Sequence, residues 1–151
     1  MVITPDTFHL SKSLKKTIKS SKFNVSVNTV FSDVIKNCQN INRSGQSGTW
    51  IGNDMIKAYC DLHDAGFAHS YEVFLDQKLV GGLYGVALGS VFFGESMFSL
   101  VSDSSKVALA YLIQISSYKL IDCQVESSHL ESLGAFKIPR DLFIQQLKTF
   151  V

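Results

Sequence analysis

Three runs of strand-forming residues between positions 70 and 98 constrain the fold more than any other feature of the sequence. Only two short breaks, Asp76-Gln77 and Gly89-Ser90, separate these runs. Two-residue breaks of this kind between apolar runs are typical of β-hairpins, so we expect three consecutive antiparallel strands. The glycines within Val80–Val86 would weaken a regular strand, which indicates a bulge or a close approach of another part of the chain.

The segment after the third run predicts a buried helix followed by another strand. Residues from about 105 to 117 are apolar on almost every side of a helix, which is the pattern of a helix without a solvated face. The strand that follows, 119–125, has apolar residues near both ends. A strand–helix–strand connection and a set of hairpins together predict a mixed α/β sheet with helices on both faces.

The remaining segments add shorter elements around this sheet. Asn28 is a candidate cap for a helix near residues 29–38, and Asn53 or Asp54 is a candidate cap for a helix that ends near Gly66. Further elements are expected over 10–19 as a helix or a short irregular segment, 127–134 as a helical turn, 140–150 as a helix, and 23–27 and 135–138 as strands. No repeat or linker interrupts the series, so residues 1–151 are interpreted as a single domain.

Composition argues against several classes of protein. Apolar residues make up 46% of the chain and charged residues 18%, and a net charge of +1 gives no sign of a strongly basic tail. The three cysteines are far apart and form no CxxC pair, which argues against a zinc module and a disulfide framework. Neither a signal peptide nor an apolar stretch of about 18 residues is visible, so we expect a soluble cytoplasmic protein with no membrane association.

Charge is nevertheless distributed unevenly near the N-terminus. The first two dozen residues contain one acid, Asp6, and a series of lysines. These lysines are Lys12, Lys15, Lys16, Lys19 and Lys22. Such local asymmetry either attracts phosphates or acidic partners, or is only the solvated face of a helix.

Polar side chains inside apolar segments mark the candidate functional residues. In a regular strand over 119–125, Asp122 and Gln124 would project from the same face, because side chains two residues apart do so. Burying them costs free energy unless they are paired or used in a site. Glu95 lies among aromatic and methionine residues and is either a satisfied structural acid or a functional one. Trp50, beside a polar loop, is either a core anchor or a surface on which a base stacks.

Five short blocks of sequence, taken together and in order, resemble the leucyl/phenylalanyl-tRNA–protein transferase family. The blocks are Gly48–Ile51, Val80–Val86, Phe93–Ser99, Leu120–Gln124 and Ser132–Gly134. The resemblance implies an acetyltransferase-like (GNAT) fold, in agreement with the strand order above. It also implies transfer of Leu or Phe, sometimes Met, from aminoacyl-tRNA to proteins with an N-terminal Arg or Lys. Such proteins then become targets of degradation through the bacterial N-degron pathway (the N-end rule).

The resemblance further implies how the reacting groups are held. The tRNA supplies an activated ester, so no cofactor, metal or enzyme nucleophile is required. Asp122 would orient Gln124, which would position the attacking amine by accepting a hydrogen bond from it. Glu95 would pair with the basic acceptor. Ser127 stands where the family commonly has Asn, and it gives a shorter hydrogen-bonding arm near the acceptor.

Aminoacyl-tRNA would be held by an apolar pocket and by basic side chains. By resemblance, the pocket for the aminoacyl side chain would be lined by Leu83, Phe92, Met97, Leu109, Leu112 and Ile121. Trp50 would stack on the terminal adenine of the tRNA. The tRNA phosphates would be met by Lys12, Lys15, Lys16, Lys19 and Lys106.

Two alternatives accompany this interpretation. The family carries an N-terminal domain ahead of the matched region, and we expect that domain to be absent from this chain. A non-catalytic module that binds basic N-termini or aminoacyl-tRNA ends is therefore the main alternative. A CoA-dependent acetyltransferase is disfavoured, because the turn Ser102–Lys106 has no glycine with which to cradle a pyrophosphate. We expect the protein to be a monomer.

Overall fold

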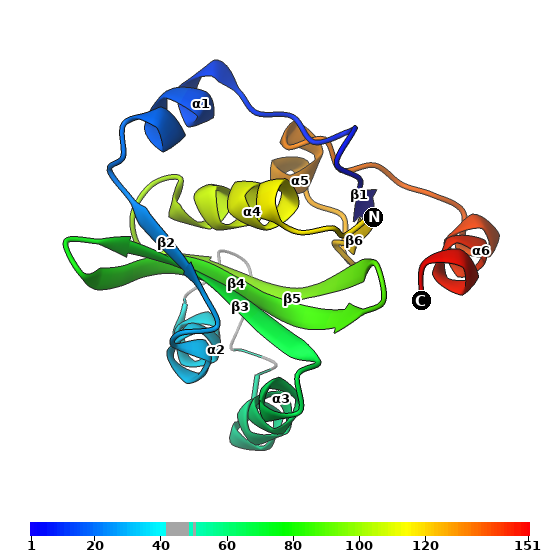
Figure 1. Cartoon of the computed structure of the whole chain (residues 1–151), viewed down its shortest axis with the longest axis horizontal. Coiled ribbons are helices and arrows are strands. Elements are labelled where there is room, and N and C mark those ends of the chain that lie inside the picture. The colour runs from blue at the N-terminus through cyan, green and yellow to red at the C-terminus, as the bar shows by residue number, and fades with distance from the viewer. Residues whose placement is uncertain (42–48, 50) are drawn as a thin grey trace.

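The computed structural model describes residues 1–41, 49 and 51–151. The described residues form a six-stranded sheet with the strand order β1-β6-β5-β4-β3-β2, flanked by helices (Figure 1). The elements in chain order are β1 Val2–Ile3, α1 Lys12–Lys19, β2 Asn24–Val27, α2 Phe31–Asn40, α3 Asn53–Asp64, β3 Ala68–Leu75, β4 Lys78–Leu88, β5 Val91–Ser99, α4 Ser104–Ile115, β6 Leu120–Asp122, α5 Ser128–Ser132 and α6 Arg140–Phe150. The prediction of a mixed α/β sheet is confirmed.

The hairpins form where the sequence predicts them. Strands β3, β4 and β5 pair antiparallel in series. Asp76 and Gln77 both have positive φ values, 49° and 63°. Two consecutive residues of this kind form the turn whose twist matches that of the flanking strands. The close approach predicted for the glycines is also present, since a Cβ at Gly81 would collide with the Ser104 side chain at the start of α4.

The predicted crossover is present and sets the sheet's mixed character. After β5 the chain passes through α4 and returns as β6, which pairs parallel to β5. Along its other edge β6 pairs antiparallel with β1, where Val2 lies opposite Asp122. Sequence analysis missed β1, because a strand of two residues is too short to show a period.

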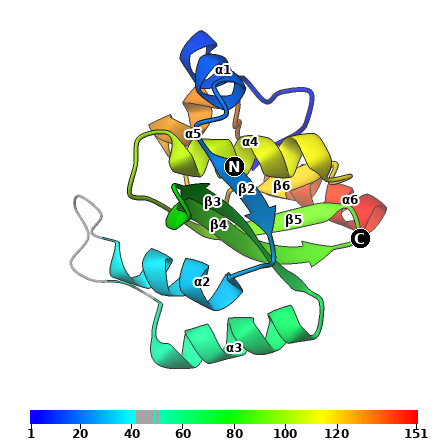
Figure 2. The ribbon, with the colours of Figure 1, turned by 60° about the vertical axis from the view of Figure 1, so that its left-hand side comes forward.

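Helices cover both faces of the sheet (Figure 2). Each face has its own apolar cluster. On one face α1, α4 and α5 enclose the larger cluster, in which Leu112 of α4 is fully buried. On the other face α2 and α3 pack over Tyr84 and Phe98. Helix α6 lies beside the β1–β6 edge, where Phe143 and Leu147 contact a smaller cluster. None of the helices in the described part of the chain is long and apolar enough to cross a membrane.

Four local predictions were wrong. Neither Asn53 nor Asp54 caps α3, whose N-cap is Gly52. The strand expected over 119–125 ends at Asp122, and the one expected over 135–138 is a single bridge between Phe136 and Val2. Asn28 does not cap α2. Its φ is 60°, and its side-chain oxygen instead accepts a hydrogen bond from the Ser70 backbone N–H at 2.9 Å. The chain reverses at this asparagine, a residue type that tolerates a positive φ better than most.

Candidate functional site

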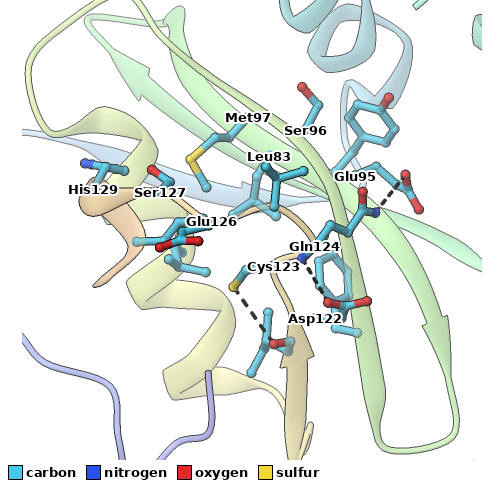
Figure 3. A pocket seen from close by; sticks show the side chains of 17 residues that line it. Leu83, Glu95, Ser96, Met97, Asp122, Cys123, Gln124, Glu126, Ser127 and His129 are labelled. Carbon is cyan, nitrogen blue, oxygen red and sulfur yellow. Dashed lines mark hydrogen bonds between the residues drawn. The ribbon is translucent and has the colours of Figure 1, made fainter. Parts of the chain in front are cut away.

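A pocket opens where β5 and β6 separate. The two strands pair only over three positions, ending at Phe93 opposite Asp122. Beyond that point β5 continues to Ser99, whereas β6 ends and the chain turns away towards α5. The resulting cavity has a volume of about 450 Å³ and is lined by apolar side chains, such as Leu83 and Met97, and by polar ones, such as Glu95 and Gln124 (Figure 3).

A bulge in β5 determines which of its side chains face the pocket. Tyr84 of β4 lies opposite Ser96, and the next residue of β4, Gly85, lies opposite Gly94. Glu95 is therefore an extra residue without a partner on β4. Phe92 and Met97 are an odd number of residues apart and would face opposite sides of a regular strand. The extra residue restores their common direction, and both line the pocket.

Gln124 lies just beyond β6 in a left-handed backbone conformation, with a φ of 56°. For a residue other than glycine this conformation costs about 1–2 kcal/mol. One compensating contact is local, because the Asp122 carboxylate accepts a hydrogen bond from the Gln124 backbone N–H at 2.9 Å (Figure 3). The same-face strand geometry predicted for Asp122 and Gln124 is thus wrong, although both residues line the pocket.

The side chain of Gln124 is held by Glu95. Its amide nitrogen Nε2 donates to Glu95 Oε2 at 3.2 Å (Figure 3). An ionised carboxylate can only accept hydrogen bonds, so the NH₂ group of the amide must face it. The amide oxygen Oε1 is then directed away from Glu95 and can accept a hydrogen bond from a bound molecule. Asp122 therefore holds the backbone of Gln124, and Glu95 fixes the orientation of its amide.

Most of the predicted apolar lining is present. Five of the six expected residues border the pocket, namely Leu83, Phe92, Met97, Leu109 and Ile121. Leu112 does not, because it points into the interior of the cluster beneath α4 and has no exposed surface. Ser127 also lines the pocket, as its assignment to the acceptor side requires.

Sequence reasoning missed several lining residues in the segment that follows Asp122. Cys123, Glu126, His129 and Leu130 all border the pocket. Burial, together with the nearby Asp122 carboxylate, raises the pKa of the Cys123 thiol to about 12. The thiol is therefore neutral near pH 7 and acts as an apolar wall, not as a nucleophile. The sequence signal that could have identified these lining residues is their closeness to Gln124 in the chain.

The end of the pocket near α5 carries a different set of charges. Lys106 of α4 forms an ion pair with Asp103 at 2.9 Å. His129 lies nearby on α5, and burial followed by the charge of Lys106 lowers its pKa. The His129 ring is thus neutral near pH 7. The predicted phosphate contact of Lys106 would have to compete with Asp103 for the same ammonium group.

The remaining predicted tRNA contacts lie elsewhere. Lys12, Lys15, Lys16 and Lys19 are exposed on α1, outside the layer formed by α4, and do not line the pocket. None of the four forms an ion pair with another residue that the structure describes. Trp50 lies outside the described residues. Within the described ranges, no group of three His, Cys, Asp or Glu side chains is arranged to hold a metal ion.

Comparison with solved structures confirms the fold. A possible acetyltransferase from Clostridium difficile superimposes with a TM-score of 0.58 at 12% identity, covering 79% of this chain and 93% of the other. A predicted acetyltransferase from Clostridium acetobutylicum, in complex with acetyl-CoA, gives a TM-score of 0.51 at 8% identity, covering 78% and 92%. At these identities the likeness establishes the GNAT-like α/β fold alone.

Comparison of sequences identifies the family. Residues 2–148 match the family model described as leucyl/phenylalanyl-tRNA protein transferase. A protein of that name from Flavobacterium johnsoniae is 53% identical, over 99% of this chain and 72% of its own length. Another from Sulfurimonas denitrificans is 52% identical, over 97% of this chain and 65% of its own length. The chain thus spans roughly two thirds of the length of these relatives. It belongs to the leucyl/phenylalanyl-tRNA–protein transferase family.

Proposed function

We propose that this chain is an aminoacyltransferase that moves Leu or Phe from aminoacyl-tRNA to proteins with an N-terminal Arg or Lys. Met is a third candidate for the transferred residue. The acceptor would thereby be marked for degradation through the N-degron pathway. Family membership supports the reaction class, and one observation supports its location. An apolar pocket meets a fixed Gln124 amide, whose oxygen is free to accept a hydrogen bond.

The reacting groups of the proposed reaction, an amine and an ester, come from its two substrates. The acceptor's α-amino nitrogen attacks the ester carbonyl and forms a peptide bond. The ester bond between the carbonyl carbon and the terminal ribose oxygen breaks, and that oxygen stays on the tRNA as a hydroxyl that carries a proton from the amine. An α-amino group has an ordinary pKa of about 7.7–8.0, so a substantial fraction is already deprotonated near neutral pH. Gln124 Oε1 would accept a hydrogen bond from this amine and hold it against the carbonyl, so that positioning supplies the rate enhancement.

The pocket walls fit an apolar aminoacyl side chain. Met97 supplies a flexible wall, and Phe92 and Ile121 supply rigid ones. The binding free energies of two apolar side chains in such a pocket differ by only about 1–3 kcal/mol for each methylene group. Acceptance of both Leu and Phe is consistent with such walls.

The acceptor would be recognised at the mouth of the pocket. The Glu95 carboxylate accepts a hydrogen bond from Gln124 and can accept further hydrogen bonds. Its negative charge can therefore also attract a basic N-terminal residue. Ser127 lines the same pocket as Gln124 and would supply a hydroxyl for the acceptor backbone. Both roles follow from the resemblance and from their place in the pocket.

The tRNA would be held by contacts outside the pocket. The exposed lysines of α1 would meet phosphates, with Lys106 contributing once Asp103 releases it. Trp50 would stack on the terminal adenine. We propose that residues 1–151 act as a single monomeric transferase domain in the cytoplasm, the compartment in which charged tRNA is available.

The proposal is tested by transfer of labelled Leu from charged tRNA to a peptide that begins with Arg. The unaltered chain should transfer Leu at low salt. Gln124→Ala should lose roughly 100-fold or more of the rate, because the amine is no longer positioned. Its thermal unfolding should change little, because Gln124 is exposed and the variant keeps the backbone hydrogen bond to Asp122.

Gln145→Ala, an exposed glutamine on α6, is the matched control and should keep the parental rate. Parental activity in Gln124→Ala would refute the proposed role of Gln124. Binding of the Arg peptide by the unaltered chain, without any transfer, would instead indicate the non-catalytic module.

A further inference from the structure

Glu126 differs from the other two carboxylates that line the pocket in what it contacts. Asp122 accepts a hydrogen bond from the Gln124 backbone, and Glu95 accepts one from the Gln124 amide. Glu126 instead forms an ion pair with Lys137, whose Nζ lies 2.6 Å from Glu126 Oε1. Both side chains of this ion pair are more than half exposed. The Glu126 carboxylate therefore lies at the edge of the pocket, where a bound molecule can reach it.

The ion pair shows that a lysine ammonium can approach the Glu126 carboxylate closely in this fold. Lys137 is not among the residues that line the pocket, so it reaches Glu126 from outside. An ion pair between two exposed side chains adds little net stability, because water solvates the separated charges almost as well. A cation that arrives from the pocket side can therefore take the place of Lys137 with little loss of free energy.

Glu126 is also placed where the second residue of an acceptor would lie. Two peptide units join Gln124 to Glu126, so their Cα atoms are at most about 7 Å apart. The carboxylates of Glu95 and Glu126 lie on different sides of the Gln124 side chain (Figure 3). Successive side chains of an extended peptide also point to opposite sides. An acceptor whose amine meets Gln124 and whose first side chain meets Glu95 thus directs its second side chain towards Glu126.

Val125 adds an apolar surface beside this carboxylate. It lines the pocket, yet 75% of its surface is exposed. Long basic side chains lay their methylene groups on such apolar surface while the charged end reaches a polar partner. Lys or Arg fits this combination of Val125 and Glu126, whereas an acidic side chain would be repelled by Glu126.

We propose that Glu126 determines specificity for the second residue of the acceptor and favours Lys or Arg there. Glu95 recognises the first residue, and Lys137 occupies Glu126 until the acceptor replaces it. The preferred acceptors therefore begin with two basic residues. The inference rests on the proposed function for the identity of the bound peptide and for the placement of its amine at Gln124.

The kinetic test compares three acceptor peptides that differ only at the second position and begin with Arg-Lys, Arg-Ala or Arg-Glu. At low salt, kcat/KM for transfer of Leu should fall in that order, with Arg-Lys roughly threefold above Arg-Ala, as expected for one exposed ion pair. Glu126→Gln should remove the difference between Arg-Lys and Arg-Ala. An unchanged difference in this variant would overturn the proposal.

Glu131→Gln is the matched control, because it removes the same charge from an exposed position on α5 that does not line the pocket. This variant should keep the parental order of the three peptides. Loss of the Arg-Lys preference in Glu131→Gln as well would show that overall charge sets the preference, and would overturn the role of Glu126.

Lys137→Ala tests whether Lys137 competes with the acceptor for Glu126. The variant frees the carboxylate and should raise the ratio of Arg-Lys to Arg-Ala transfer by roughly a further twofold. In a Glu126→Gln background the same change should leave the ratio near one, because there is no carboxylate to free. An equal rise in that background would mean that Lys137 only repels basic peptides, and would overturn its assigned competition for Glu126.

A binding measurement separates this inference from the proposed function. In calorimetry without tRNA, the Arg-Lys peptide should bind roughly threefold more tightly than Arg-Ala, and Glu126→Gln should abolish the difference. Added salt should reduce the preference, because the charges are exposed. If the unaltered chain shows this preference but transfers nothing, the proposed function fails and the inference stands. Equal affinity for the two peptides, including no measurable binding of either, would overturn the inference even where transfer is intact.

Discussion

The two halves of β5 differ in how they are paired and buried. From Val91 to Phe93 the strand is paired on both sides, with β4 and with β6, and Val91 and Phe92 are almost completely buried. From Gly94 to Ser99 it is paired only with β4, and Glu95, Ser96 and Met97 are half-buried along the pocket. The sheet is continuous where it builds the core, and it is open where it offers a binding wall.

Two departures from regular geometry lie in the opened part. Glu95 is an unpaired bulge residue, and Gln124 has a positive φ of 56°. Each costs free energy that the continuous part of the sheet must offset. Local irregularity of this kind is common at functional sites, where a side chain has to be aimed and not merely packed. The first half of β5 thus stabilises the fold, and the second half forms a wall of the candidate site.

The largest effect on stability is expected from the core beneath α4. Leu112→Ala should lower the free energy of unfolding by about 2–5 kcal/mol, because it leaves a cavity in a fully buried cluster. Denaturation in urea measures this change. Gln114→Ala, at an exposed position on the same helix, should change stability by less than about 0.5 kcal/mol. If Leu112→Ala altered amino-acid preference while leaving stability intact, the division between core and pocket would be wrong.

An intermediate effect is expected at the pocket wall. Met97→Ala enlarges the pocket and should shift the ratio of Phe to Leu transfer towards Phe by roughly tenfold, in line with the limited discrimination of an apolar pocket. Competition between the two charged tRNAs measures the ratio. Met55→Ala serves as the control, since Met55 packs on the opposite face of the sheet. An equal shift in both variants would argue against Met97 as a wall of the aminoacyl site.

The smallest effect is expected at α1, outside both halves of the strand. Replacing Lys15 and Lys19 by Ala should weaken tRNA binding and make the salt dependence shallower, by roughly one unit of slope for each phosphate that is no longer neutralised. Binding of charged tRNA across a series of salt concentrations measures both. Lys148→Ala, on the exposed side of α6, is the control. An unchanged slope in the double variant would remove α1 from the tRNA-binding surface.

Much of the fold could be predicted from sequence because it depends on local signals. The turn at Asp76-Gln77 separates two apolar runs, and α4 lacks a polar face over most of its length. Signals of this kind need no knowledge of distant residues. The parallel return of β6 beside β5 then followed from the usual strand–helix–strand connection.

The details of the site could not be predicted, because they depend on non-local geometry. No local pattern shows that Glu95 is a bulge residue, since the bulge exists only relative to β4. The left-handed conformation of Gln124 is compensated by Asp122 and Glu95, and only Asp122 is nearby in the sequence. Leu112 was assigned to the pocket because an apolar residue on α4 can face either the cavity or the core. Sequence alone does not distinguish these two directions.

Methyl NMR with a non-hydrolysable phenylalanyl-adenosine analogue gives the most direct test that the opening between β5 and β6 holds the aminoacyl group. Signals from Leu83, Met97 and Ile121, which line the opening, should shift on binding. Those of Val34 and Ile35, buried residues of α2 on the opposite face, should remain unchanged. Shifts confined to the α2–α3 face, or binding that leaves the pocket signals unaltered, would contradict this placement of the site.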